Sequence, residues 1–341
     1  MKTRLVTWAG LLLSAALIGY LLYRFDFGAA LAAVAMADKS WLVVATVLYV
    51  SLFALRGYRW TVLLEPLKAV PIIETTEVFM IGVMANNVLP ARLGDVARAF
   101  FLAKKEKIPA SATFSNVLLE RIFDGLAVVG LLNFVLWYAP PKDLWVHTVG
   151  WVMAAVFVGA VVFCTVIAFW EAKFLALAHR IAAHLPPKAT SLVHLFEKLA
   201  KGLHTLKSPR RTIQVGILSL VIWMLEAAVY FLVQRAFGLQ IPYVGMVLVM
   251  SILTLGLTAP SAPGFVGVFE GLIIASVALY GVKEPLGPAF AITLHAVHYL
   301  PGTIIGAFLA WRGGLKLREL QAAASAKVAD DSEVEPSVRV L

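Results

Sequence analysis

The sequence is poor in charged residues. Asp, Glu, Lys and Arg make up 14% of its 341 residues, whereas apolar and aromatic residues make up 61%, and the mean hydropathy is +0.86. A soluble domain with this composition could not cover its apolar surface. The composition therefore excludes a soluble globular enzyme and predicts an all-α, polytopic helical membrane protein.

Cysteine and the common catalytic motifs are also scarce. The one cysteine, Cys164, lies within an apolar run and can form no disulfide within the chain. The sequence contains no P-loop, no nucleophile elbow and no His-Glu-x-x-His motif, so we expect no cofactor and no metal. The net charge of +9 comes from short basic clusters beside apolar runs, which argues against nucleic-acid binding.

Six apolar runs are close to the about 20 residues that a helix needs to cross a membrane. They cover residues 5–23, 41–64, 112–138, 145–170, 213–237 and 289–311. We expect one transmembrane domain, residues 1–315, with halves at 1–170 and 212–315. The charged connector, residues 171–211, is predicted to form two short helices on the cytoplasmic surface, where its basic residues would attract anionic lipids. Residues 316–341 have the composition of a disordered cytoplasmic tail.

Two polar interruptions break apolar stretches, one in each half of the chain. The first reads Asn86-Asn87-Val88-Leu89-Pro90-Ala91-Arg92-Leu93-Gly94-Asp95, between arms at 72–89 and 95–102. The second reads Thr258-Ala259-Pro260-Ser261-Ala262-Pro263-Gly264-Phe265-Val266-Gly267, between arms at 246–257 and 265–280. Proline disfavours helix at the preceding residue, and the freed backbone groups must face protein or trapped water. We predict two broken, re-entrant helical hairpins whose tips meet, with two complete crossings as an alternative for the second.

Lysine and arginine assign the two sides of the membrane. Basic residues gather at 2–4, 92–107, 173–211 and 312–318, whereas the intervening loops hold few. The positive-inside rule then places both termini in the cytoplasm of a cell (inner) membrane. It also makes the two hairpins enter from opposite faces, as in an inverted repeat. Asp95 with Glu270, and Glu120 with His295, share a separation of 175 positions (270 − 95 and 295 − 120), which supports that repeat.

Three ionisable residues lie about two turns inside the third run, where charge is costly: Glu120, Arg121 and Asp124. Arg121 can reach Asp124 at i,i+3, so one interpretation is a structural ion pair that lets this helix pack. In the alternative, Arg121 offers its planar fork to a phosphate while the acids hold it and exchange a proton.

The first break is surrounded by further polar residues. Arg92 lies within it, where a cation and helix N-terminal amides together make an anion site, whereas Arg98 could equally extend to the membrane interface. Asp95 could be the N-cap of the following helix or have a functional role. Asn86 and Asn87 could satisfy the broken backbone or donate to a head group.

Ionisable residues recur in the second half. Glu270 follows the second break, and His295 and His298, at i,i+3 on the last run, could face it in a proton-exchanging cluster, which we favour over a metal site. Glu226, within the fifth run, is a further candidate proton carrier whose partner the sequence does not indicate. Arg56 and Arg59 are expected at the interface.

Three groups of residues, in this order along the chain, are similar to those of a known family. They are Asn86 to Asp95 with Arg98, then Glu120-Arg121 with Asp124, and then Ala262 to Gly267 with Glu270. Over about residues 7–314 the chain resembles the membrane domain of the lysylphosphatidylglycerol synthase and flippase family. The resemblance implies a membrane-integral lipid translocator, here in a stand-alone form without the soluble aminoacyl-transferase domain that some members carry.

We therefore expect a flippase that moves an anionic or amphoteric phospholipid, or a polyprenyl-phosphate-linked lipid, through a crevice between the hairpins. The expected substrate-binding residues are Asn86, Asn87, Arg92, Arg98, Arg121, Pro263 and Gly264. The expected gating or proton-coupling residues are Asp95, Glu120, Asp124, Glu226, Glu270, His295 and His298. Rival interpretations are an intramembrane enzyme acting on lipid-linked phosphate and a non-catalytic partner of envelope-lipid synthesis enzymes.

Overall fold

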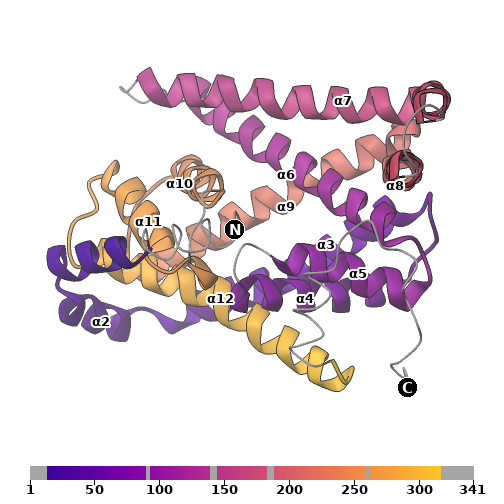
Figure 1. Ribbon diagram of the computed structural model, residues 1–341. Coiled ribbons are helices and arrows are strands. Elements are labelled where there is room, and N and C mark those ends of the chain that lie inside the picture. The colour runs from indigo at the N-terminus through magenta and orange to yellow at the C-terminus, as the bar shows by residue number, and fades with distance from the viewer. Residues whose placement is uncertain (1–13, 90–92, 139–143, 183–187, 259–261, 316–341) are drawn as a thin grey trace.

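A computed structural model describes residues 14–89, 93–138, 144–182, 188–258 and 262–315, and its described residues contain helices and no strand. The order after helical residues 14–24 is α2 (Phe27–Met36), α3 (Lys39–Leu64), α4 (Ile72–Val88), α5 (Leu93–Glu106), α6 (Ala110–Tyr138), α7 (Leu144–Ala182), α8 (Lys188–Gly202), the short 3-10 helix η2 (His204–Lys207), α9 (Pro209–Ala236), α10 (Tyr243–Gly256), the 3-10 helix η3 (Pro263–Phe265), α11 (Val268–Ala278) and α12 (Leu286–Arg312) (Figure 1). The prediction of an all-α, polytopic membrane protein is confirmed.

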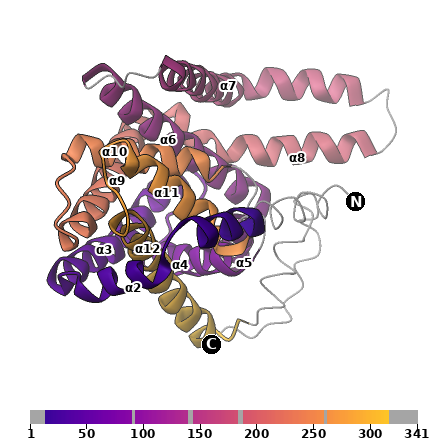
Figure 2. The ribbon, with the colours of Figure 1, turned by 90° about the vertical axis from the view of Figure 1, so that its left-hand side faces the viewer.

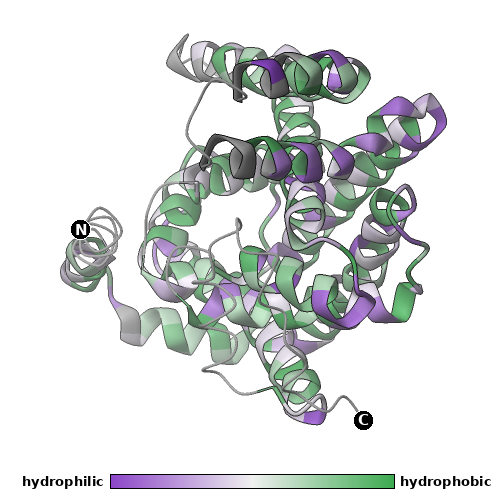
Figure 3. Cartoon of the chain, turned by 45° about the vertical axis from the view of Figure 1, so that its right-hand side comes forward, coloured by the Kyte–Doolittle hydropathy of each residue, from purple (hydrophilic) through white to green (hydrophobic). Residues whose placement is uncertain are grey.

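Among the described residues, four helices are long and apolar enough to cross a membrane: α3, residues 151–176 of α7, α9 and α12. A fifth long helix, α6, carries the three charges Glu120, Arg121 and Asp124. Within the first predicted run the structure describes residues 14–23, which are helical, and residues 14–24 form a pair bent by 83° with the following helix α2. Asp26 explains where the second part begins, since its carboxylate accepts a hydrogen bond from the Ala29 amide and caps α2. Hydrophobic residues make up most of the helices coloured by hydropathy in Figure 3, and hydrophilic ones form short clusters.

The two halves of the chain share one order of elements. Each contains a long helix, two short helices and another long helix: α3, α4, α5 and α6 in the first half, and α9, α10, α11 and α12 in the second. The first long helices of the two halves, α3 and α9, pack against each other at the centre. This repetition matches the predicted repeat.

Both pairs of short helices are antiparallel hairpins. In the first, the position of a Cβ on Gly94 would fall 2.5 Å from the Asn86 nitrogen, and one on Gly82 would fall 2.9 Å from Cδ of Arg98. In the second, a Cβ on Gly256 would fall 2.5 Å from Cδ1 of Leu272. At about 1.5 Å per residue, the 14 residues of α10 span about 21 Å, which is shorter than the about 30 Å hydrocarbon core. The lengths favour re-entrant hairpins over complete crossings.

The hairpins lie tip to tip along α12. In the first half of that helix, His295 contacts the Gly264 carbonyl at the tip of the second hairpin. About two turns further, Thr303 accepts a hydrogen bond from Asn87 at the tip of the first hairpin. At the far end, Arg312 pairs with Glu77, near the base of the first hairpin. The two bases therefore point to opposite ends of α12, as the inverted arrangement requires.

Glycine also sets the distance between α12 and α4. Gly302 and Gly306 form a G-x-x-x-G pattern, and a Cβ on Gly306 would collide with the Met80 carbonyl of α4. Small residues at this spacing let two helix backbones touch inside a membrane bundle.

The connector contains two helical stretches, as predicted: the last part of α7 after residue 170, and α8. The helix α7 continues past residue 170 with a kink at Trp170 (φ −105°, ψ 16°), and its last part lies beside α8, both extending away from the bundle (Figure 2). The return to the bundle is anchored, because Asn116 of α6 donates a 2.7 Å hydrogen bond to the Gly202 carbonyl. Residues 183–187, with the Pro186-Pro187 pair, and the predicted tail lie outside the described residues.

Candidate functional site

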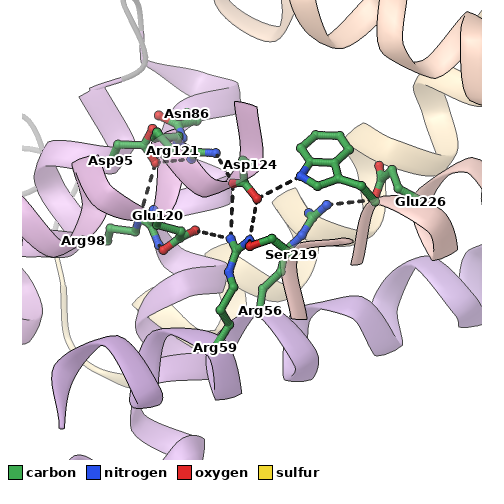
Figure 4. A network of polar contacts seen from close by, with 11 residues as sticks. Arg56, Arg59, Asn86, Asp95, Arg98, Glu120, Arg121, Asp124, Ser219 and Glu226 are labelled. Carbon is green, nitrogen blue, oxygen red and sulfur yellow. Dashed lines mark hydrogen bonds and ion pairs between the residues drawn. The ribbon is translucent and has the colours of Figure 1, made fainter. Parts of the chain in front are cut away.

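Arg59 lies at the centre of a buried polar network (Figure 4). Its guanidinium binds the Asp124 carboxylate at 2.5 Å and the Glu120 carboxylate at 3.0 Å, and it donates to the Ser219 hydroxyl at 2.7 Å. Arg59 and Glu120 are fully buried. Because α3, α6 and α9 each supply a member, this arginine joins the two halves of the chain, and the interfacial position expected for it is wrong.

Arg98 is also fully buried. Its guanidinium lies between the rings of Trp60 and Phe79, 4.8 and 4.9 Å from their centroids, and binds Glu120 at 3.1 Å. An arginine held between two aromatic faces and a carboxylate is fixed in position. The alternative in which Arg98 extends to the membrane interface is therefore wrong.

Arg121 and Asp95 join the tip of the first hairpin to α6. The Nε and Nη2 atoms of Arg121 donate to the Asp95 carboxylate at 3.0 and 2.6 Å, which is bidentate geometry. Asn86 donates to the same carboxylate at 3.3 Å. The Arg121 side chain is 40% exposed, and its Nη1 lies 3.6 Å from Asp124. Arg121 therefore combines a fixed orientation with an accessible edge.

A second set of contacts links α3, α9 and α12. Arg56 binds Glu226 at 2.8 Å, and Glu226 also contacts Nε2 of His298 at 2.9 Å. The Arg56 guanidinium lies 5.9 Å from the ring centroid of Trp223, whose indole N–H donates to Asp124 at 2.9 Å. Through this tryptophan, the contacts of Glu226 continue into the network around Arg59.

Glu270 performs two tasks at the start of α11. One carboxylate oxygen accepts from the Gly267 amide at 2.7 Å in a capping box, and the other lies 2.5 Å from Nδ1 of His295. The His295 ring stacks on Phe269 with centroids 4.3 Å apart. Its Nε2 lies 2.9 Å from the Gly264 carbonyl, so the histidine holds both the helix α11 and the tip of the hairpin.

The two hairpin tips meet beside Tyr299. A Cβ on Gly264 would lie 3.6 Å from the Asn87 carbonyl, and the Tyr299 hydroxyl donates to that carbonyl at 3.5 Å. Gly264 has φ +71°, a conformation that favours glycine, and follows Pro263 in η3. The predicted meeting of the tips is confirmed.

Several sequence interpretations need correction. Asp95 lies inside the first turn of α5 and binds Arg121, so it is not the N-cap of that helix. Asp95, rather than Asp124, is the principal partner of Arg121. His298 contacts Glu226 instead of Glu270.

Besides Arg59 and Ser219, the network contains two further residues that the sequence interpretation missed. Arg56 pairs with Glu226, which supplies the partner that the sequence did not indicate, so the interfacial position expected for Arg56 is also wrong. Trp223 connects this pair to Asp124. A signal did exist for Arg56, because it falls on the same helical face as Arg59, at i,i+3. Arg92 lies outside the described residues.

The donor set suits an anion better than a metal. Within the described part of the chain, no group of three His, Cys, Asp or Glu side chains is arranged to hold a metal ion. Arginine and amide groups at the first tip offer donors, and carboxylates behind them hold the arginines in place. Such an arrangement can bind a phosphate or carboxylate group.

Residues 7–306 match the family model described as the lysylphosphatidylglycerol synthase TM region. The chain belongs to this family. Among its relatives, a UPF0104 membrane protein of Methanothermobacter thermautotrophicus is 26% identical over 81% of this chain and 84% of its own length. Glycosyltransferase AglD of Haloferax volcanii is 27% identical over 85% of this chain and 51% of its own length. No solved structure matches.

The residues that match the lysylphosphatidylglycerol synthase TM region family include both hairpins and the whole polar network, since the match extends from before α2 to within α12. The protein is therefore a membrane protein of this family. The chain spans about half the length of AglD, so the activity in that relative's name belongs to the relative.

Proposed function

We propose that this protein moves a lipid with an anionic or amphoteric head group between the leaflets of the membrane. The observation that carries the proposal is the meeting of two oppositely directed hairpin tips at Asn87 and Gly264, next to the accessible edge of Arg121. Broken helices that meet inside a bundle supply polar groups at a depth where lipid tails supply none.

Each expected substrate-binding residue has a distinct place in this proposal. Arg121 offers its exposed edge to phosphate while Asp95 keeps its guanidinium oriented, and Asn86 donates to the same Asp95 carboxylate. Asn87, Pro263 and Gly264 form the junction through which a head group passes. Arg98 is buried and positions Glu120 and Asp95, so we assign it to support of the site rather than to substrate contact. Arg92 remains a proposed phosphate contact.

The connector supports an orientation with its helices on the cytoplasmic surface. Trp170 at the kink is exposed, and Lys173 lies 5.6 Å from its ring centroid, a combination typical of either membrane interface. The basic residues at 173–211 favour the cytoplasmic one. Anionic lipids are the proposed partners of this surface, and the cell (inner) membrane is the proposed location. Cysteines at Lys107 and Ser208 should then label from the cytoplasmic side only, and a cysteine at Lys283 from the outside only.

An intramembrane enzyme is the second candidate, because one relative is named a glycosyltransferase. Purified protein in vesicles separates the two functions. Fluorescent lipids with anionic, zwitterionic and polyprenyl-phosphate head groups are followed by quenching from one side, and their mass is measured afterwards. Faster movement of unchanged lipid supports translocation, whereas a new product supports an enzyme. Absence of both overturns the proposal and leaves a non-catalytic partner of envelope-lipid enzymes.

Two variants sharpen this experiment. Arg121→Ala removes the accessible guanidinium and should slow movement of phosphate-bearing lipids. Arg312→Ala removes another partly exposed arginine, at the far end of α12, and should leave movement unchanged. Equal rates in the two variants would remove Arg121 from the proposed site.

A further inference from the structure

His295 lies between two hydrogen-bond acceptors. Its Nε2 is 2.9 Å from the Gly264 carbonyl oxygen, and its Nδ1 is 2.5 Å from a carboxylate oxygen of Glu270. A carbonyl oxygen can only accept, so Nε2 must carry a hydrogen. A neutral imidazole then has an unprotonated Nδ1, which cannot donate to an ionised carboxylate.

The contact therefore requires one additional proton. Either His295 is an imidazolium beside ionised Glu270, or His295 is neutral and Glu270 is a carboxylic acid that donates to Nδ1. In both cases the pair holds one proton in addition to the hydrogen on Nε2, and its net charge is zero. Loss of that proton leaves one N–H for two acceptors. The charged Glu270 carboxylate is the stronger acceptor, so the remaining hydrogen is held on Nδ1, and the lone pair of Nε2 then faces the Gly264 carbonyl oxygen, which is repulsive.

We propose that Glu270 and His295 form a proton-binding site that holds the tip of the second hairpin against α12. Binding of the proton closes the Gly264 contact, and release of the proton opens it, so that lipid passage between the tips is coupled to proton transfer. The contact is favoured at low pH and is lost as pH rises. The coupling rests on the proposed lipid movement, whereas the proton itself is detectable without transport.

His298, the other histidine on this face of α12, has a similar pair of contacts but a different charge environment. His298 also lies between two acceptors, the Leu294 carbonyl and Glu226, at 2.8 and 2.9 Å. However, Glu226 also binds Arg56, which remains as a cation if His298 loses a proton. The other contact of Glu270 is the Gly267 amide, which is uncharged. Proton loss therefore changes the electrostatics more at Glu270 than at Glu226.

The groups that face the pair come from several elements. Residues 14–24 present the neutral Ser14 and Ile18 to the tip, where the Ser14 hydroxyl accepts a hydrogen bond from the Ala262 amide. Phe269 of α11 stacks on the His295 ring, and Tyr299 of α12 meets it edge-on with centroids 5.8 Å apart. On α4, the side chain at this level is the neutral Asn87, while Glu77 binds Arg312 at the other end of α12. The helix α2, which also packs against α12, contains no ionisable residue.

Nuclear magnetic resonance of ¹⁵N-histidine in the full chain tests the proton directly. The His295 signals are assigned by their loss in His295→Gln. At low pH we expect either both ring nitrogens protonated or, in infrared spectra, a carboxylic-acid band that Glu270→Gln removes. A His295 ring with one proton, together with no such band from pH 5 to 9, would overturn the proposal.

Glu270→Gln tests the coupling. The glutamine oxygen can still accept from the Gly267 amide, and its NH₂ can donate to an unprotonated Nδ1, so the contact no longer needs a proton. The pH dependence of lipid movement should be flattened in this variant. His194→Gln, which changes an exposed histidine of α8, should retain the wild-type profile.

These experiments distinguish failure of the proton-binding site from failure of the proposed lipid movement. A wild-type pH profile in Glu270→Gln, in protein that moves lipid, would overturn the proton-binding site alone. Wild-type protein that moves no lipid would overturn the proposed function, and the spectroscopic result would still decide whether the pair holds a proton.

Discussion

The two hairpins meet the rest of the bundle by different means. Charged groups fix the first hairpin, because Asp95 binds Arg121 and Arg98 binds Glu120. The second hairpin packs through glycine and aromatic contacts, and its ionic contact is the pair of Glu270 with His295. Separating buried charges costs more free energy than parting apolar surfaces of similar area. The first hairpin is therefore the fixed side of the site, and the second hairpin is the part able to move.

Arg59→Met should have the largest effect, because it leaves Glu120 and Asp124 without their shared cation. Removal of one partner from a buried ion pair costs about 3–5 kcal/mol. We expect that decrease in the free energy of unfolding, measured by denaturant unfolding in detergent. Adding Asp124→Asn should recover part of the loss. A decrease similar to that of an exposed ion pair would contradict the view that buried charge stabilises α6, the helix to which the first hairpin is bound.

Substitution of glycine by alanine compares the hairpins directly. At Gly94, the new Cβ meets backbone atoms of Gly82 and Asn86, which cannot move independently, so we expect a loss of about 1–3 kcal/mol. At Gly256, the Cβ meets the end of the flexible Leu272 side chain, and alanine gains about 1 kcal/mol in helix propensity. The melting temperature should therefore fall for Gly94→Ala and change little for Gly256→Ala. Equal decreases would remove the distinction between a rigid and an adaptable hairpin.

Arg121→Lys tests the fork at the tip of the first hairpin. Lysine retains the charge but loses the bidentate contact with Asp95. We expect a loss of lipid movement of about tenfold, equivalent to about 1.4 kcal/mol, with little change in unfolding. If the lysine variant moves lipid at the wild-type rate, bidentate binding of phosphate by Arg121 is wrong, and the site requires only a positive charge at this position.

Arg312→Ala should have the smallest effect. The Arg312–Glu77 pair is partly exposed, and such pairs contribute about 0–1 kcal/mol. The melting temperature should therefore change little. A decrease as large as that of Arg59→Met would show that the ends of α4 and α12 are more strongly coupled than their exposure indicates.

The breaks were predictable because they depend on local chemistry. Pro90 disfavours helix at Leu89, and α4 ends at Val88 with Leu89 extended (φ −93°, ψ 145°). The charges of Glu120 and Asp124 within an apolar run also indicated a buried site. Their partners were not predictable, since Arg59 lies 61 and 65 positions from them, and only packing of α3 against α6 brings them together.

Two features were not predictable from the sequence because they depend on tertiary contacts: the continuation of α7 into the connector, and the bend after the first run. Hydropathy predicts that a span ends near Trp170, but it does not show that the helix continues beyond the kink. Residues 24–41 have the charges expected of a loop, whereas Asp26 starts the helix α2 within them. The glycine pair at positions 302 and 306 is visible in the sequence, but the helix it contacts is not.

That glycine pair has a mechanical consequence. With backbones in contact at Gly306 and Met80, α12 is held rigidly to the first hairpin. His295 and Arg312 lie on this helix 17 residues apart, or about 26 Å along a helix. When the tip of the second hairpin leaves His295, the far end of α12 at Glu77 therefore stays in place.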